Sequence, residues 1–210
     1  NVMINQDEFQ EMREKMEKFD AERERVIKAC RDLQKMSKNS IFDLHRGDLE
    51  KCKKQLDTVV TQATELLPVI EETPSLRGGS FAGVMEEFAE AQLFYLFLTE
   101  KRVGGQSELG LPVDGPEYLG GICDLTGELG RYAVARATKR DVSAVKLCWE
   151  AVDKVVGLLL SLPSLPPHMM KKADQNKATL RKLETMLYEL SLSRKSKAVV
   201  EDEGGDGKKG

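Results

Sequence analysis

The chain has 210 residues, of which 40% are hydrophobic and 32% are charged, enough for one sizeable hydrophobic core. Aromatic residues make up only 6% and β-branched runs are scarce, which argues against a large sheet. The formal net charge of −3 gives no general attraction for nucleic acid, so a polyanion would need a local basic patch or a bound metal. No apolar run reaches about 18 residues, which excludes a membrane-spanning helix. Residues 1–20 are too polar for a signal peptide.

The four cysteines stand singly along the chain, at Cys30, Cys52, Cys123 and Cys148, and form no Cys-x-x-Cys pair. This spacing is not typical of a zinc site or a disulfide framework. We therefore expect a reducing intracellular compartment.

The first predicted helix begins near Phe9. Its apolar residues recur every three or four positions along a narrow seam, as in a coiled coil. A break is expected at Ser37–Ser40, followed by a short helical segment to Arg46 and a joint at Gly47 and Asp48. A second helix is predicted from Leu49 to Ile70, with Pro68 as the site of a kink. The residues of the first seam are Phe9, Met12, Met16, Phe19, Val26, Cys30 and Leu33.

The remaining pattern predicts four further helices. Ser80 is the expected N-cap of a third helix over residues 81–102, after a loop at 73–79. A Gly-rich loop at 103–114 leads to a fourth helix over 116–139, and the fifth runs from Asp141 to Leu162. The sixth contains Leu180–Leu190, and the polar tail from residue 195 is expected to be disordered. The sequence thus predicts an all-α protein, with one domain of six to seven antiparallel helices over residues 1–194.

Two acidic pairs stand out within this frame. Glu87 and Glu90 are three residues apart, and a helical wheel places both inside the apolar stripe that contains Val84, Ala91 and Phe94. A buried carboxylate costs several kcal/mol unless a cation or hydrogen bonds offset it. Such a position therefore calls for a compensating cation.

The second pair is Asp124 and Glu128, four residues apart on the fourth helix, with Arg131 beside them. Counted from the connecting loop, Glu90 lies about 17 Å and Asp124 about 12 Å along their helices. In an antiparallel hairpin the two pairs would therefore meet at similar levels. Glycines on the same face would let a ligand or another helix approach closely, namely Gly120, Gly121 and Gly127.

Converging carboxylates without a nearby His or Cys favour a hard cation such as Mg²⁺, Mn²⁺ or Ca²⁺. Such an ion suits phosphodiester cleavage. The alternative is that the acids are solvated or paired with Lys and Arg. A ferritin-like di-iron site would need Glu-x-x-His, a context that neither His45 nor His168 has. The basic face of the first helix is either an RNA contact or a solvated surface, and its relevant residues are Arg23, Arg25, Lys28 and Arg31.

At these residues the chain resembles a known family. Its acidic strings are similar to those of the translin family, and within it to the branch of translin-associated protein X more than to translin itself. The resemblance spans about residues 19–194. The strings that carry it are Ser40–Arg46, Phe88–Ala91, Tyr118–Gly121, Asp124–Leu129 and Leu187–Leu190.

The resemblance implies an all-α fold of about seven helices and partnership with translin subunits in a closed hetero-oligomer. It also implies a Mg²⁺- or Mn²⁺-dependent endoribonuclease acting on single-stranded or small RNA, including tRNA fragments and the passenger strand in RNA silencing. Glu87, Glu90, Asp124 and Glu128 would then hold the metal and activate water. Which acid orients that water stays open, with Glu128 as one candidate.

Around these acids, Arg131 could pair with a carboxylate or contact the scissile phosphate, and the basic residues of the first helix could line the RNA path. The alternative function is a non-catalytic, nucleic-acid-binding subunit whose helical seams build an oligomer. The expected location is the cytoplasm and also the nucleus, and we do not expect the few residues before Phe9 to hold a basic import signal.

Overall fold

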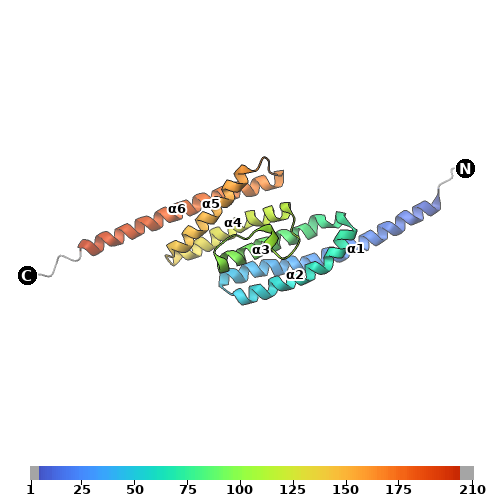
Figure 1. Ribbon diagram of the computed structural model, residues 1–210, viewed down its shortest axis with the longest axis horizontal. Coiled ribbons are helices and arrows are strands. Elements are labelled where there is room, and N and C mark those ends of the chain that lie inside the picture. The colour runs from blue at the N-terminus through green and yellow to red at the C-terminus, as the bar shows by residue number, and fades with distance from the viewer. Residues whose placement is uncertain (1–4, 204–210) are drawn as a thin grey trace, which may run out of the picture. The chain divides into compact units, whose positions relative to one another are not determined.

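The computed structural model describes residues 5–203, with side chains up to residue 193. Over these residues the chain contains helices and no strand, which confirms the all-α prediction (Figure 1). None of these helices has a stretch long and apolar enough to span a membrane. The elements are α1 (Gln6–Arg46), α2 (Leu49–Glu72), η1 (Pro74–Leu76), η2 (Arg77–Phe81), α3 (Ala82–Glu100), η3 (Gln106–Glu108), α4 (Gly115–Thr138), α5 (Val142–Ser161) and α6 (Pro167–Glu203).

The described chain divides into two compact units. Unit 1 comprises Asn1–Tyr95 and Gly105–Tyr118, and unit 2 comprises Leu96–Gly104 and Leu119–Gly210. The boundary between the units therefore falls inside both α3 and α4. Each unit is described by itself below.

Unit 1 is built on the antiparallel pair α1 and α2, which lie side by side (Figure 1). The α1 seam is buried from Val26 onward and packs with the α2 seam that begins at Cys52. Gly47 ends α1 with φ of 82°, a conformation that glycine adopts without strain, and Asp48 caps α2 by accepting from the Lys51 amide. The joint at Gly47 and Asp48 is confirmed.

The predicted break at Ser37–Ser40 is wrong, because α1 continues through it to Arg46. Both serines are fully buried, and their hydroxyls donate to carbonyls one turn earlier, at Leu33 and Met36. These hydrogen bonds satisfy both buried hydroxyl groups with carbonyls of α1 itself, so the helix does not need to end here. The small side chains also continue the seam where α2 lies close, and the Ser40 hydroxyl further contacts Gln55 at 3.0 Å.

A cluster of charged groups fixes the first turn of α4 in unit 1. Asp114 and Glu117 form a reciprocal cap, since each side chain accepts from the backbone N–H of the other at 2.8 Å. Arg77 donates to the Glu117 carboxylate at 2.6 Å. Burial raises the pKa of Glu117, although Asp114 and Arg77 oppose the shift through hydrogen bonds and the charge of Arg77. Gly79, with φ of 69°, provides the bend between this cluster and α3.

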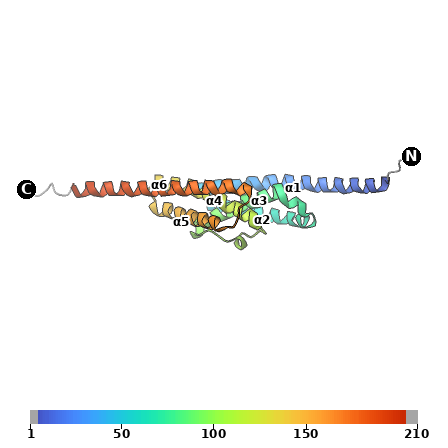
Figure 2. The ribbon, with the colours of Figure 1, turned by 90° about the horizontal axis from the view of Figure 1, so that it is seen from above.

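Unit 2 contains α5 and α6 lying side by side, together with the part of α4 that follows Leu119 (Figures 1 and 2). The fifth helix starts after Asp141 as the sequence predicts, and Asp141 caps α5 by accepting from the Ala144 amide at 3.1 Å. The predicted start of the disordered tail, residue 195, falls inside α6, which continues to Glu203. The last residues of that predicted tail, 204–210, lie outside the described chain.

Candidate functional site

The first acidic pair lies on the unit 1 part of α3. Glu90 is only 8% exposed, which confirms that its carboxylate lies within the apolar surface of this helix. The Glu87 side chain is 27% exposed and lies 3.3 Å from the Lys38 ammonium on α1. The neighbours Phe88, Ala89 and Ala91 are fully buried, so α3 is apolar on most of its circumference. A helix of this kind is normally covered on all sides, and acids on it are exceptional.

The second acidic pair lies on the unit 2 part of α4. Asp124 and Glu128 are half-buried, with side chains 35% and 23% exposed. The Lys172 ammonium on α6 donates to Asp124 Oδ2 at 2.5 Å. Arg131 lies 3.7 Å from Glu128, one turn further along α4. This contact gives Arg131 the first of its two predicted roles, a pair with an acid.

A neutral polar pair, which the sequence analysis missed, links α4 to α6 two residues after Asp124. The Thr126 hydroxyl lies 2.6 Å from the Asn176 side chain, and Asn176 is 2% exposed. With its amide oriented to suit its neighbours, Asn176 donates to the carbonyls of Cys123 and Lys172 and to the Thr126 hydroxyl. Lys172 and Asn176 are four residues apart, which indicated a shared helix face, but nothing in the sequence linked that face to α4.

At Gly127, one of the glycines in this prediction, an added Cβ would meet only open space. The close approach is instead at Gly130, whose added Cβ would lie 2.8 Å from Thr179 Cγ2 on α6. Contacts of α4 with α6 thus run from Asp124–Lys172 through Thr126–Asn176 to Gly130 and Thr179. Because both residue numbers rise together, α4 and α6 run parallel along this contact.

The four predicted acids are therefore divided between the units, with Glu87 and Glu90 in unit 1 and Asp124 and Glu128 in unit 2. Their convergence on one metal stays a prediction. Within either unit, over the residues that the structure describes, no three His, Cys, Asp or Glu side chains are grouped so that they could hold a metal ion. The four cysteines are free and buried, and burial raises the pKa of Cys148 to about 12.

Comparison with protein families gives a match over residues 21–194 to the family model described as Translin family. The chain belongs to the translin family. This match covers every helix of both units except the first turns of α1 and the end of α6. The comparison with curated proteins gave no match.

Solved structures show the same translin-family fold at low sequence identity. "Crystal structure of AfC3PO" is 22% identical with a TM-score of 0.81, and the match covers 89% of this chain and 98% of that one. "Structure of AfC3PO - duplex RNA complex" is 23% identical with a TM-score of 0.78, covering 89% and 98%. "Crystal structure of apo-NeC3PO" is 22% identical with a TM-score of 0.76, covering 90% and 99%. At this identity the likeness establishes the fold.

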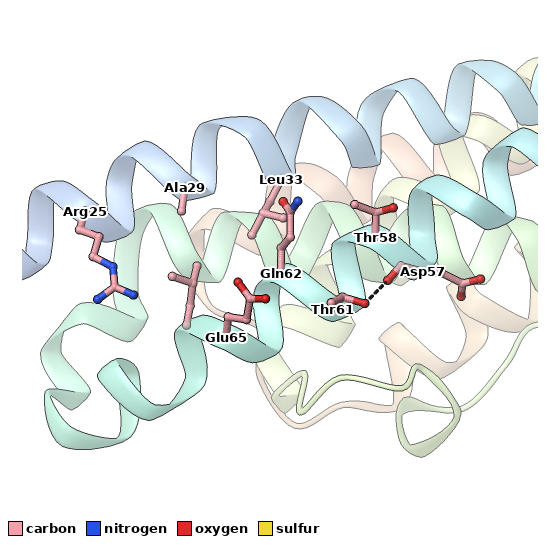
Figure 3. A pocket seen from close by; sticks show the side chains of 9 residues that line it. Arg25, Ala29, Leu33, Asp57, Thr58, Thr61, Gln62 and Glu65 are labelled. Carbon is pink, nitrogen blue, oxygen red and sulfur yellow. Dashed lines mark hydrogen bonds between the residues drawn. The ribbon is translucent and has the colours of Figure 1, made fainter.

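The basic residues predicted to contact RNA lie on α1 of this translin-family fold, except Arg131 on α4. Arg23, Lys28 and Arg31 are exposed, as a polyanion contact requires. Arg25 is exposed as well, and it lines a groove of about 580 Å³ between α1 and α2. In Figure 3 Arg25 reaches into this groove from α1, and Glu65 reaches into it from α2. Asp57 lines the same groove, so its mixed charge does not favour a phosphate backbone.

Proposed function

We propose that this translin-family chain belongs to the translin-associated protein X branch and is the catalytic subunit of a metal-dependent endoribonuclease. Its substrate class would be single-stranded or nicked small RNA, such as a passenger strand or a tRNA fragment. The observation that carries the proposal is the Glu90 carboxylate, which is only 8% exposed among the fully buried apolar residues Phe88, Ala89 and Ala91 of α3. Buried acids in such surroundings are often functional groups of a site.

The chemistry of the acids fits a hard cation. Glu87, Asp124 and Glu128 each lie within ion-pair distance of a Lys or Arg in their own unit. Four carboxylates without imidazole or thiolate are a donor set for Mg²⁺ or Mn²⁺. We assign Glu87, Glu90, Asp124 and Glu128 to hold the ion. When bound, such an ion supplies a water of lowered pKa and stabilises charge on a phosphoryl group.

The other roles fall to groups of this chain. Glu128 is the acid we assign to orient the attacking water, because it is half-buried and accessible from solvent. Arg131, which is exposed and next to Glu128, can exchange that carboxylate for a phosphate oxygen. Exposed Arg23, Lys28 and Arg31 would bind the RNA backbone away from the cut.

The test is cleavage of a labelled single-stranded RNA by the full chain assembled with its partner. Glu128→Gln should lower the cleavage rate by about 10²–10³-fold, because the water loses its acceptor. Asp124→Asn should also abolish Mn²⁺ binding measured by titration. Glu71→Gln, an exposed acid on α2, is the matched control and should cleave at the wild-type rate. Full-rate cleavage by the Glu128 variant would refute the assignment.

The partners we propose are translin subunits in a closed hetero-oligomer, in the cytoplasm and also the nucleus. The supporting observation is the N-terminal half of the α1 seam. Phe9, Met12, Met16 and Phe19 are all exposed, although they continue the seam that is buried from Val26 onward. Both views show these turns of α1 running out beyond α2 (Figures 1 and 2). An exposed apolar stripe in heptad spacing is a surface for another helix.

A charge in the middle of this stripe should disrupt that assembly. Met16→Glu should shift the complex toward smaller species in sedimentation velocity, because it places a carboxylate in a helix interface. Lys15→Glu, one residue away and off the stripe, is the control. An unchanged sedimentation coefficient for Met16→Glu would show that this part of α1 is not the interface.

The second candidate function is a non-catalytic subunit that builds the oligomer and binds nucleic acid. It is favoured by the ion pairs of Glu87, Asp124 and Glu128 with Lys38, Lys172 and Arg131, which give these acids a structural role. Mn²⁺ titration separates the two candidates. A wild-type protein that binds no Mn²⁺ would support this second function.

A further inference from the structure

We propose that Lys172 is a displaceable counter-ion of Asp124. Its ammonium holds the carboxylate in the metal-free protein, leaves it when a divalent cation binds, and then becomes available to an RNA phosphate. Lys172 would thereby couple metal loading to RNA binding. The inference rests on the proposed metal-dependent ribonuclease function and adds a positioning residue, on α6, that the acidic motifs do not contain.

The contact itself is the first observation. Lys172 Nζ lies 2.5 Å from Asp124 Oδ2, so the two groups form a close, charge-assisted hydrogen bond. A cation that binds Asp124 needs lone pairs of the same carboxylate. An ammonium held this closely also repels a divalent ion through space. Lys172 and the metal therefore compete for Asp124.

The second observation is the way α6 is held. The buried Asn176 binds Thr126 and the Cys123 carbonyl on α4, and it also binds the carbonyl of Lys172 itself. Met169 and Ala173, on either side of Lys172, are buried as well. The backbone at Lys172 is therefore fixed opposite Asp124, whatever the side chain does. Thr126, the central residue of the second acidic motif, gains a role through this contact.

The third observation is the partial exposure of Lys172. Its side chain is 23% exposed, so part of it reaches solvent, and its four-carbon stem carries rotatable bonds. Once the carboxylate is occupied, the ammonium can turn outward without any movement of α6. An ammonium beside a metal-bound carboxylate is then a point charge suited to a phosphate.

The decisive measurement is Mn²⁺ affinity of the full chain without RNA, from the EPR signal of free Mn²⁺. Lys172→Met removes the competitor and should bind Mn²⁺ about 5–10-fold more tightly than wild type. Lys172→Arg keeps the charge and should stay close to wild type. Lys171→Met removes the same charge from an exposed neighbouring residue and should change the affinity less than about 2-fold. Thermal melting and far-UV circular dichroism check that each variant is folded, and Lys172→Gln replaces Lys172→Met if the latter is not.

Unchanged or weaker Mn²⁺ binding by Lys172→Met overturns the inference, since the lysine would then be irrelevant or would support the metal ligand. Equal tightening by Lys171→Met also overturns it, because the effect would be one of net charge. If wild type and Lys172→Met both bind no Mn²⁺, the proposed metal-dependent function itself fails. Binding by wild type with no difference at Lys172 leaves that function standing and removes only the inference.

The proposed binding of Lys172 to RNA is tested by fluorescence anisotropy with a labelled 12-nucleotide single-stranded RNA. The measurement is made with and without Ca²⁺, which replaces Mg²⁺. The RNA is checked for intactness afterwards. In wild type, Ca²⁺ should release Lys172 and tighten RNA binding. In Lys172→Met this gain should be about 3-fold smaller. Equal gains in wild type, Lys172→Met and Lys171→Met would overturn the coupling.

Discussion

Charged groups hold the first turn of α4 in unit 1, whereas neutral groups hold the middle of the same helix in unit 2. Arg77, Asp114 and Glu117 form the charged cluster, and Thr126 and Asn176 form the neutral pair. Both are buried at their centres, since Glu117 is 4% and Asn176 2% exposed. The difference matters for the candidate site, because Asp124 lies beside the neutral pair. Beside the Asp124–Lys172 ion pair, its helix is thus held locally by groups that carry no charge.

The largest effect is expected from breaking the charged cluster. Arg77→Met leaves the buried Glu117 carboxylate without its guanidinium partner and should lower the free energy of unfolding by about 3 kcal/mol. Urea denaturation measures this loss. Arg13→Met breaks a fully exposed pair with Glu17 and should cost less than about 0.5 kcal/mol. Equal losses in the two variants would contradict the distinction between buried and surface charge.

Breaking the neutral pair should have a smaller effect. Asn176→Ala removes hydrogen bonds to Thr126 and to two carbonyls, and should lower the free energy of unfolding by about 2 kcal/mol. The loss should be the same from pH 4.5 to pH 7.5, because no group of the pair titrates there. Gln175→Ala, at the adjacent exposed position, is the control. A strongly pH-dependent loss at Asn176 would show that the pair is coupled to a titrating group.

The close approach of α4 to α6 gives a third, smaller effect. Gly130→Ala places a methyl group against Thr179 Cγ2 and should destabilise the protein by about 1 kcal/mol. Gly127→Ala enters open space on the same helix and should stabilise it by up to about 1 kcal/mol. Thermal melting should therefore shift in opposite directions for the two variants. Adding Thr179→Ser to Gly130→Ala removes the contacting methyl group and should restore stability.

The smallest effect is the pH dependence that the charged cluster carries. Because burial raises the pKa of Glu117 above 4.5, the folded state holds its proton more tightly than the unfolded state does. The contribution of Glu117 is then greatest below pH 4.5 and declines as pH rises through the pKa of the folded state. Wild type should lose stability relative to Glu117→Gln over this interval, as measured by urea denaturation at several pH values. A relative gain with rising pH would show that the Arg77 pair outweighs burial.

Local patterns in the sequence determined most of the fold. Three-four spacing of apolar residues predicted α1, α2 and α5, and glycine followed by aspartate predicted the joint at Gly47 and Asp48. The serines at 37 and 40 gave a false break because their hydroxyls can end a helix or bond within it. Only packing against α2 decides between these two outcomes.

For the candidate site too, some features followed from the sequence and others only from the tertiary structure. The sequence by itself determined that Glu90 lies in an apolar stripe, because position on a helix follows from residue number alone. It also gave the i, i+4 pair Asp124 and Glu128. Only the tertiary structure decided that Lys172 faces Asp124 and that Asn176 binds Thr126, since these partners are about 50 residues apart. Contacts between helices depend on how whole faces pack, and no local pattern specifies which polar groups will meet there.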